Sequence, residues 1–166
     1  KQKDVIKYVD LFAGMGGIRI GFSNGFKRLG IETECVFSSE VKEHAILTYR
    51  KNFNDNKVYG DITKIDSNAI PNFDFLLAGF PCQPFSSAGK GLGFEDTRGT
   101  LFFDIARILK DKQPDGFILE NVEGLVNHDK GKTLKVILKT LSDLGYTVSW
   151  KVLNAKEFGL AQNRAR

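Results

Sequence analysis

Short apolar stretches alternate with segments of helical periodicity along the chain, and this alternation restricts the fold more than any other feature of the sequence. Between the apolar stretches, residues such as Leu134, Ile137 and Leu141 recur at the spacing of one helix face. The stretches that we predict as strands are 5–12, 33–38, 57–60, 73–80, 115–122 and 146–154. Strands that are apolar for most of their length and separated by helices predict an α/β fold, with a doubly wound, mostly parallel sheet covered on both faces.

Length and composition indicate one globular domain. The chain has 166 residues, and we predict a single domain over 1–166. A hydrophobic fraction of 42% excludes a disordered chain. The longest apolar runs are far shorter than the roughly 20 residues that span a bilayer, and the charged N-terminus does not resemble a signal peptide. We therefore expect a cytoplasmic protein. The net charge of +4 suits a polyanionic partner but does not establish one.

The chain contains two cysteines, Cys35 and Cys82, and two histidines, His44 and His128. They are too few and too widely separated for a zinc site, so we expect no bound metal. Both histidines are interpreted as surface residues. Cys35 lies inside an apolar strand, where cysteine usually fills the core.

Ligands of open α/β sheets bind beyond the carboxyl ends of the strands. Segments rich in glycine, proline or polar residues follow the predicted strands at this edge. They are DLFAGMGG (10–17), SSEV (38–41), GDI (60–62), GFPCQPFS (79–86) and ENVEG (120–124). We therefore expect the functional residues in these segments.

The first of these segments contains three glycines that allow a sharp turn and close approach of a ligand. A dinucleotide fingerprint would require glycine where Arg19 stands, which argues against NAD. Glu40 can accept hydrogen bonds from a ribose diol, and Asp61 can accept one from an adenine amino group. Together these residues favour an adenosine-containing cofactor, although a structural tight turn and a solvated acid at a helix N-terminus remain alternatives.

Cys82 stands between Pro81 and Pro84, which hold it on a stiff loop outside the strand. We interpret it as a nucleophile, with a structural thiol as the alternative. If the last residues are extended, Arg164 and Arg166 project from the same face and suit a carbonyl oxygen or phosphate. A disordered basic tail is the alternative there. Glu120, at the end of a predicted strand, is a candidate general acid.

These motifs occur together in an order that resembles the DNA cytosine-C5 methyltransferase family. The residues that carry the resemblance are FAGMGG, Glu40, GDI, PCQPFS, GTLFF (99–103), ENV and QNRAR. The resemblance covers essentially the whole chain. It implies a Rossmann-like, S-adenosylmethionine-dependent methyltransferase fold that acts on double-stranded DNA and releases S-adenosylhomocysteine.

The resemblance also implies a mechanism. The Cys82 thiolate would add to C6 of a cytosine flipped out of the duplex, which makes C5 nucleophilic toward the methyl group of the cofactor. Glu120 would protonate or hydrogen-bond N3, and Asn121 would help to hold it. Arg164 and Arg166 would orient the base, Glu120 and flanking phosphates. Loss of the C5 proton would then release Cys82.

The same resemblance implies two sets of binding residues. Phe12 would pack on adenine, and Val41 stands where the family often has a larger aromatic residue, which predicts a weaker contact. The cofactor-binding residues would be Phe12, Ala13, Gly14, Met15, Gly16, Gly17, Glu40, Val41, Asp61, Ile62, Pro81 and Leu101. The DNA-binding residues would be Ser86, Ser87, Lys90, Arg98, Gln162, Arg164 and Arg166. For the loop 86–99, a flexible surface loop without a DNA contact is the alternative.

The sequence stops at Arg166, whereas family members continue with another strand, a target-recognition region and a final cofactor motif. We therefore expect a fold that is incomplete at the C-terminus. The chain would be either a truncation or one polypeptide of a split enzyme whose second polypeptide supplies the rest. We expect little turnover from these residues alone.

Three other functions compete with this interpretation. A tRNA cytosine-C5 methyltransferase usually has threonine at the position of Ser86. A non-catalytic subunit would not need Cys82, Glu120 and Arg164 together. An NAD enzyme is disfavoured by Arg19. We therefore expect a bacterial modification enzyme of a restriction–modification system, associated with the nucleoid through its DNA.

Overall fold

The computed structural model of the protein describes residues 5–54, 57–82 and 101–166. Its strands are β1 (Val5–Leu11), β2 (Glu32–Ser39), β3 (Val58–Tyr59), β4 (Phe75–Gly79) and β5 (Gly116–Glu120). Its α-helices are α1 (Gly17–Arg28), α2 (Glu43–Phe53), α3 (Leu101–Lys112) and α4 (Lys132–Asp143). Short 3₁₀ helices are η1 (Ile62–Lys64), η2 (Ser67–Ala69), η3 (Glu123–Val126), η4 (His128–Gly131) and η5 (Ala155–Phe158). The first five predicted strands are thereby confirmed.

The strands form one sheet in the order β3-β2-β1-β4-β5. β1 pairs in parallel with β2 and β4, and β2 pairs in parallel with β3. The central strand β1 buries Val9 and Leu11 completely, and its neighbour β4 does the same with Leu76 and Leu77. Strand β4 is apolar throughout because both of its faces are covered. The predicted α/β fold with a doubly wound parallel sheet is confirmed.

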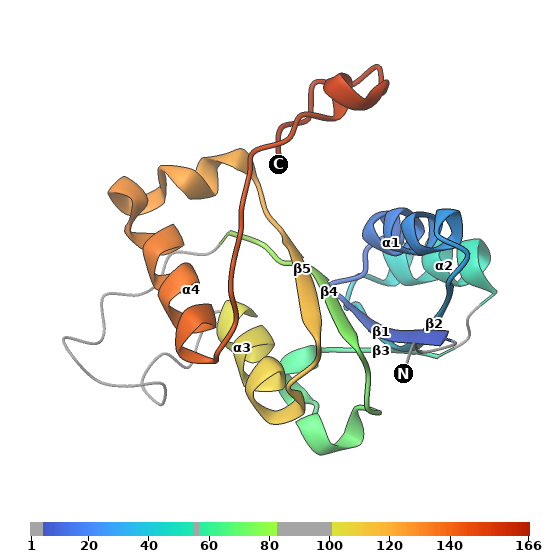
Figure 1. The fold of residues 1–166 in the computed structure, drawn as a ribbon. Coiled ribbons are helices and arrows are strands. Elements are labelled where there is room, and N and C mark those ends of the chain that lie inside the picture. Colours follow the sequence, from blue (N-terminus) through green and yellow to red (C-terminus); the bar gives the residue numbers. More distant parts are fainter. Residues whose placement is uncertain (1–4, 55–56, 83–100) are drawn as a thin grey trace. The chain divides into compact units, whose positions relative to one another are not determined.

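Helices α1 and α2 lie side by side over β1 and β2 (Figure 1). Phe22 of α1 packs against Tyr8 of β1, with ring centroids 4.9 Å apart, and both belong to one buried cluster with Leu77. Helix α2 buries Ala45 and Tyr49. The helical periodicity of these segments therefore reflects packing against the sheet.

The chain divides into two compact units. The sheet unit comprises residues 1–80 and 107–119, and the C-terminal unit comprises residues 81–106 and 120–166. The sheet unit contains β1 to β4 and all of β5 except Glu120, which belongs to the C-terminal unit with α4. A single catalytic domain over 1–166 stays a prediction.

Helix α4 is the main helix of the C-terminal unit, and it buries Thr133, Ile137 and Leu141. His128 of η4 lies 2.7 Å from the Thr133 hydroxyl through Nδ1, so this histidine helps to fix the start of α4. No helix among the described residues is long and apolar enough to cross a bilayer. Within the same ranges, no group of three His, Cys, Asp or Glu side chains is arranged to hold a metal ion.

The predicted strand at 146–154 is wrong. Residues 146–153 have no regular secondary structure, and an isolated antiparallel bridge joins Asn154 to Ala165. The sequence alternates in polarity as a strand does, yet Trp150 is exposed. A strand exists only where a neighbour supplies a ladder of hydrogen bonds, and alternation cannot show whether that neighbour is present.

Candidate active site

The glycine-rich loop, residues 12–17, connects β1 to α1. Its backbone has positive φ angles at Phe12 (53°), Gly14 (55°) and Gly16 (88°). Glycine adopts this conformation at no steric cost, whereas a residue with a side chain, such as Phe12, loses about 1–3 kcal/mol. Such strain persists only when neighbouring groups hold the backbone in place. The loop is therefore shaped by its surroundings.

Helix α2 and strand β2 supply those surroundings. A Cβ atom at Gly16 would overlap the ring of Phe53. Asn52 donates from Nδ2 to the carbonyl of Met15 at 2.9 Å, and the Ala13 amide donates to the carbonyl of Ser39 at 3.0 Å. Met15 and Gly17 are exposed, so the outer side of the loop is open to a ligand.

Glu40 follows β2, and its half-buried carboxylate binds the loop directly. Oε2 accepts from the Gly14 amide at 2.8 Å, while Oε1 accepts from the amides of Val41 and Lys42 at 2.8 and 2.9 Å. A carboxylate offers about four acceptor positions, of which three are used here. One ligand hydroxyl can bind as the site stands, and a ribose diol requires that one backbone donor be exchanged for the second hydroxyl.

Asp61 caps η1, and its Oδ1 accepts from the amide and hydroxyl of Thr63 at 3.0 and 2.8 Å. These hydrogen bonds lower the pKa of Asp61 below its ordinary value. Oδ2 lies 3.9 Å from Lys64 Nζ, which leaves it accessible to an amino group. Of the apolar residues predicted for the same pocket, Val41 is exposed and Ile62 is buried in the core of the sheet unit.

The C-terminal unit contains the other predicted site residues. Pro81 is exposed, and Leu101 is half-buried at the start of α3. Cys82 is a free, half-buried thiol in the segment after β4. Cys35, in the sheet unit, packs against the hydrophobic cluster, and burial raises the pKa of its thiol to about 11. Cys35 is therefore protonated at neutral pH and unsuited to nucleophilic attack, so Cys82 is the candidate nucleophile.

Glu120, the last residue of β5, forms ion pairs with both arginines of the QNRAR segment. Its Oε1 lies 3.0 Å from Arg166 Nε and 3.8 Å from Arg164 Nη2. The prediction that the two guanidinium groups share a face is confirmed, because both reach the same oxygen. Both of these ion pairs end on Oε1, so Oε2 can face a substrate.

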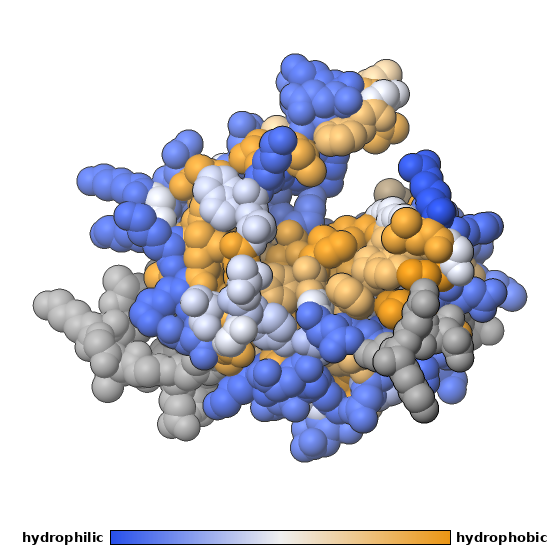
Figure 2. Space-filling view, in the orientation of Figure 1, coloured by the Kyte–Doolittle hydropathy of each residue, from blue (hydrophilic) through white to orange (hydrophobic). Residues whose placement is uncertain are grey.

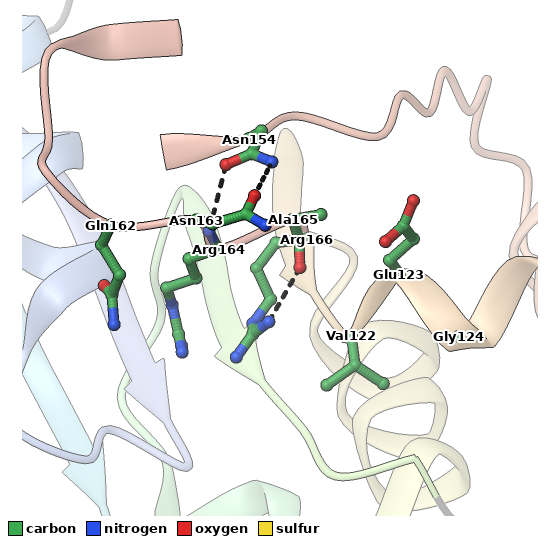
Figure 3. Close-up of a pocket in the computed structure, with 9 residues that line it drawn as sticks. All are labelled: Val122, Glu123, Gly124, Asn154, Gln162, Asn163, Arg164, Ala165 and Arg166. Atoms are coloured by element: carbon green, nitrogen blue, oxygen red, sulfur yellow. Dashed lines mark hydrogen bonds between the residues drawn. The ribbon is translucent and has the colours of Figure 1, made fainter. Parts of the chain in front are cut away.

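A hairpin formed by residues 153–166 places these arginines. Leu153 and Arg166 exchange backbone hydrogen bonds, both at 2.9 Å. The Asn154 side chain spans the hairpin, because Oδ1 accepts from the Arg164 amide at 3.0 Å and Nδ2 donates to Asn163 Oδ1 at 2.7 Å (Figure 3). Sequence analysis missed Asn154, whose signal in the sequence is only that its residue type is common directly before a helix, here η5.

A hollow of about 440 Å³ lies beside the hairpin. In Figure 3 the side chains of Gln162, Arg164 and Arg166 extend in the same direction. The residues that line the hollow are Val122, Glu123, Gly124, Asn154, Gln162, Asn163, Arg164, Ala165 and Arg166. Convergent amide and guanidinium donors suit a carbonyl oxygen or a phosphate.

The remaining predicted residues are less informative. Asn121 is half-buried, and its Oδ1 accepts from the Val122 amide at 2.8 Å, so it orders the turn after β5.

The hairpin also exposes Phe158 and Leu160, and hydrophobic atoms reach the surface there in Figure 2. Single exposed apolar residues of this kind are common on protein surfaces. The predicted DNA contacts Ser86, Ser87, Lys90 and Arg98 lie outside the described residues.

The sheet order, the glycine-rich loop after β1, the acid after β2 and the acid that ends β5 define a methyltransferase fold of the S-adenosylmethionine-dependent class. Solved structures agree on this fold. Spodoptera frugiperda DNMT2, solved as a mutant, superposes with a TM-score of 0.71 at 24% identity, over 96% of this chain and 47% of that one. S. pombe Dnmt2 superposes with a TM-score of 0.71 at 19% identity, over 97% of this chain and 47% of that one.

The family follows from sequence. The profile of C-5 cytosine-specific DNA methylases matches residues 6–166, and the chain belongs to this family. It is 63% identical to the Type II methyltransferase M.NgoBV of Neisseria gonorrhoeae over 97% of its length, and 60% identical to M.BanI of Aneurinibacillus aneurinilyticus over 97%. It covers 40% and 37% of these relatives, so it spans about two fifths of their length. The resemblance inferred from the motifs is confirmed.

Proposed function

We propose that this chain is the catalytic part of a DNA (cytosine-5-)-methyltransferase, which methylates C5 of a flipped-out cytosine in double-stranded DNA. The observation that carries the proposal is the cluster of Glu120, Arg164 and Arg166 at the end of β5. A carboxyl group that donates its proton matches the ring nitrogen N3 of cytosine, and the guanidinium groups can donate to the carbonyl oxygen.

The sheet unit fits S-adenosylmethionine as the methyl donor. The open side of the loop accommodates a ligand close to the backbone, Glu40 has an acceptor position for a ribose hydroxyl, and Asp61 Oδ2 is accessible to the adenine amino group. The strained backbone at Phe12 supports a binding role for this loop. The chemistry that the donor supplies when bound is an electrophilic methyl group, and S-adenosylhomocysteine is the product.

The C-terminal unit supplies the residues that activate cytosine. The Cys82 thiolate adds to C6, and the electron pair of the C5–C6 double bond moves into the ring, where the Glu120 carboxyl group acts as general acid and donates its proton to N3. Arg166 and Arg164 hold Glu120 in place through Oε1. After methylation, water takes the C5 proton, the electron pair of the C5–H bond restores the C5–C6 double bond, and Cys82 leaves as the thiolate.

Double-stranded DNA is favoured over tRNA as the substrate because relatives at 60% identity or more are Type II methyltransferases. We infer a role in bacterial restriction–modification from the same relatives, in the cytoplasm where the DNA substrate lies. Gln162 and the two arginines, which line one hollow, are candidates for contacts with the base and its phosphates.

Methyl transfer from labelled S-adenosylmethionine tests this function. The assay uses the protein in the form that its native cell produces. Duplex DNA of mixed sequence and tRNA are offered in parallel. We expect label in cytosine C5 of DNA, no label with Cys82→Ala, and retained transfer with Cys35→Ala, which removes the buried thiol. Label in tRNA alone, or full activity of Cys82→Ala, would contradict the proposal.

A further inference from the structure

A chain of polar side chains lies beneath the glycine-rich loop and is not used by the proposed chemistry. Arg19 donates from Nη1 to the Tyr49 hydroxyl at 2.8 Å, and this hydroxyl donates to Asp10 Oδ2 at 3.0 Å. Asp10 is 1% exposed and Tyr49 is 0% exposed. The three residues come from α1, α2 and β1, the elements that surround the loop. One hydroxyl therefore ties together both ends of the loop and the helix beneath it.

The same helix holds the loop at two further points. Phe53 fills the space beneath Gly16, and Asn52 binds the Met15 carbonyl. The Arg19 guanidinium also lies over the Phe53 ring, 4.0 Å from its centroid. A shift of α2 would consequently move the loop through three separate contacts. Of the three residues of α2 that make these contacts, Tyr49 also binds a buried carboxylate, that of Asp10.

The charge of Asp10 is sensitive to these neighbours. The pKa of Asp10 is raised to about 7, because burial and, to a lesser degree, the nearby carboxylate of Glu40 raise it more than the Tyr49 hydrogen bond and the Arg19 charge lower it. Cys35 of β2 also faces this group, but burial raises its own pKa to about 11, so it stays neutral. The carboxyl group of Asp10, which lies next to the start of the loop, therefore gains or loses its charge near neutral pH.

We propose that Tyr49 is a positioning residue for cofactor binding, which couples the charge of Asp10 to the geometry of the loop 12–17. Ionised Asp10 makes a charge-assisted hydrogen bond with the Tyr49 hydroxyl, and this holds α2 and the loop in the binding geometry. A negative charge at this position also attracts a cationic cofactor. Cofactor affinity thus rises as pH increases through the pKa of Asp10. The inference rests on the proposed function, because it assumes that S-adenosylmethionine binds at this loop.

The test compares S-adenosylmethionine dissociation constants, by calorimetry between pH 6 and pH 9, for the wild-type protein and Tyr49→Phe. The variant keeps the ring and loses only the hydroxyl. We expect about tenfold weaker binding at pH 8, the usual scale for a hydrogen bond to a charged group, and a smaller difference at pH 6. Taking the ratio of the two proteins at each pH cancels the titration of the ligand itself.

Tyr8→Phe is the matched control. Tyr8 is 2% exposed, lies on the same strand as Asp10, and its hydroxyl binds Ser23 Oγ at 3.1 Å, away from the loop. It should cost similar stability and leave cofactor affinity unchanged. If Tyr49→Phe does not fold, Asp10→Asn serves instead, and its affinity relative to the wild type should fall as pH rises from 6 to 8.

Three results would overturn the inference. The first is that Tyr49→Phe binds S-adenosylmethionine as tightly as the wild type at every pH. The second is that Tyr8→Phe weakens binding as much as Tyr49→Phe does. The third is that the affinity of Asp10→Asn relative to the wild type does not change with pH. A wild-type protein that binds no S-adenosylmethionine would overturn the proposed function as well, which distinguishes the two failures.

Discussion

The glycine-rich loop and the Glu120 cluster use polar groups in opposite ways. Around the loop, Asp10 and Tyr49 are buried and bonded to each other, so the geometry is fixed before a ligand arrives. At the Glu120 cluster, the side chains of Arg164 and Arg166 remain 47% and 29% exposed. Exposed ion pairs contribute little stability and rearrange easily. If the proposed function holds, the cofactor side is therefore preformed, whereas the substrate side is held loosely enough to re-form around a flipped base.

The largest effect that this contrast predicts is the loss of chemistry without loss of cofactor binding. Glu120→Gln should lower kcat by about 10²–10⁴-fold, the usual contribution of a general acid. The S-adenosylmethionine dissociation constant should stay within about twofold, because Glu120 belongs to the other compact unit. Steady-state kinetics and calorimetry measure the two quantities. Glu157→Gln, an exposed acid on the hairpin, is the control and should be nearly silent.

For Gly16→Ala we predict the reverse of the Glu120→Gln result, namely a loss of stability and of cofactor binding. The new methyl group overlaps Phe53, and the φ angle of 88° disfavours any side chain, so we expect a loss of about 2–4 kcal/mol in the free energy of unfolding, with much weaker cofactor binding. Urea unfolding measures the first effect. Gly21→Ala, within α1 and with open space around it, should instead stabilise by about 0.5–1 kcal/mol. Equal stability of the two variants would show that the loop is not preformed.

Asn154 tests how the substrate side is held. Asn154→Ala removes the acceptor of the Arg164 amide and the bond to Asn163, so we expect kcat to fall about tenfold, the scale of one lost hydrogen bond, with cofactor affinity unchanged. Asn154→Asp keeps the acceptor Oδ1 and should recover part of the loss. An unaltered kcat in Asn154→Ala would mean that the hairpin orders the arginines without this side chain.

The smallest effect concerns the two arginines. Arg166 lies closer to Glu120 than Arg164 does and is less exposed, so Arg166→Lys should reduce kcat more than Arg164→Lys. Neither change should alter the free energy of unfolding by more than about 0.5 kcal/mol, because both pairs are partly screened by solvent. Kinetics and urea unfolding of both variants measure these differences. A larger stability loss would show that this cluster is as rigid as the loop.

The sheet could be predicted from sequence because burial on both faces leaves a direct record. Strands such as β4 are apolar throughout, and the residues between strands repeat at helical spacing. The segment 146–154 shows the limit. Its alternation is as regular as that of a strand, but pairing depends on a neighbour that local sequence does not specify.

The candidate site could be predicted only where its chemistry is unusual for its position. Glu120 and the two arginines were identified because charged residues stood out after apolar strands or in an extended segment. Tyr49 belongs to none of the motifs, since its ring packs like any core aromatic and its hydroxyl partner is set by tertiary structure. Asn154 was missed for the same reason. Residues that position others leave almost no signal in one sequence.

The most direct test of the central claim is covalent trapping on duplex DNA that contains 5-fluorocytosine, in the presence of S-adenosylmethionine. Fluorine at C5 cannot leave as a proton, so the bond between the enzyme and C6 persists after methyl transfer. The account predicts a stable protein–DNA adduct, mapped by mass spectrometry to Cys82 and absent from Cys82→Ala. No adduct from a protein that binds both S-adenosylmethionine and DNA, or an adduct at another residue, would contradict it.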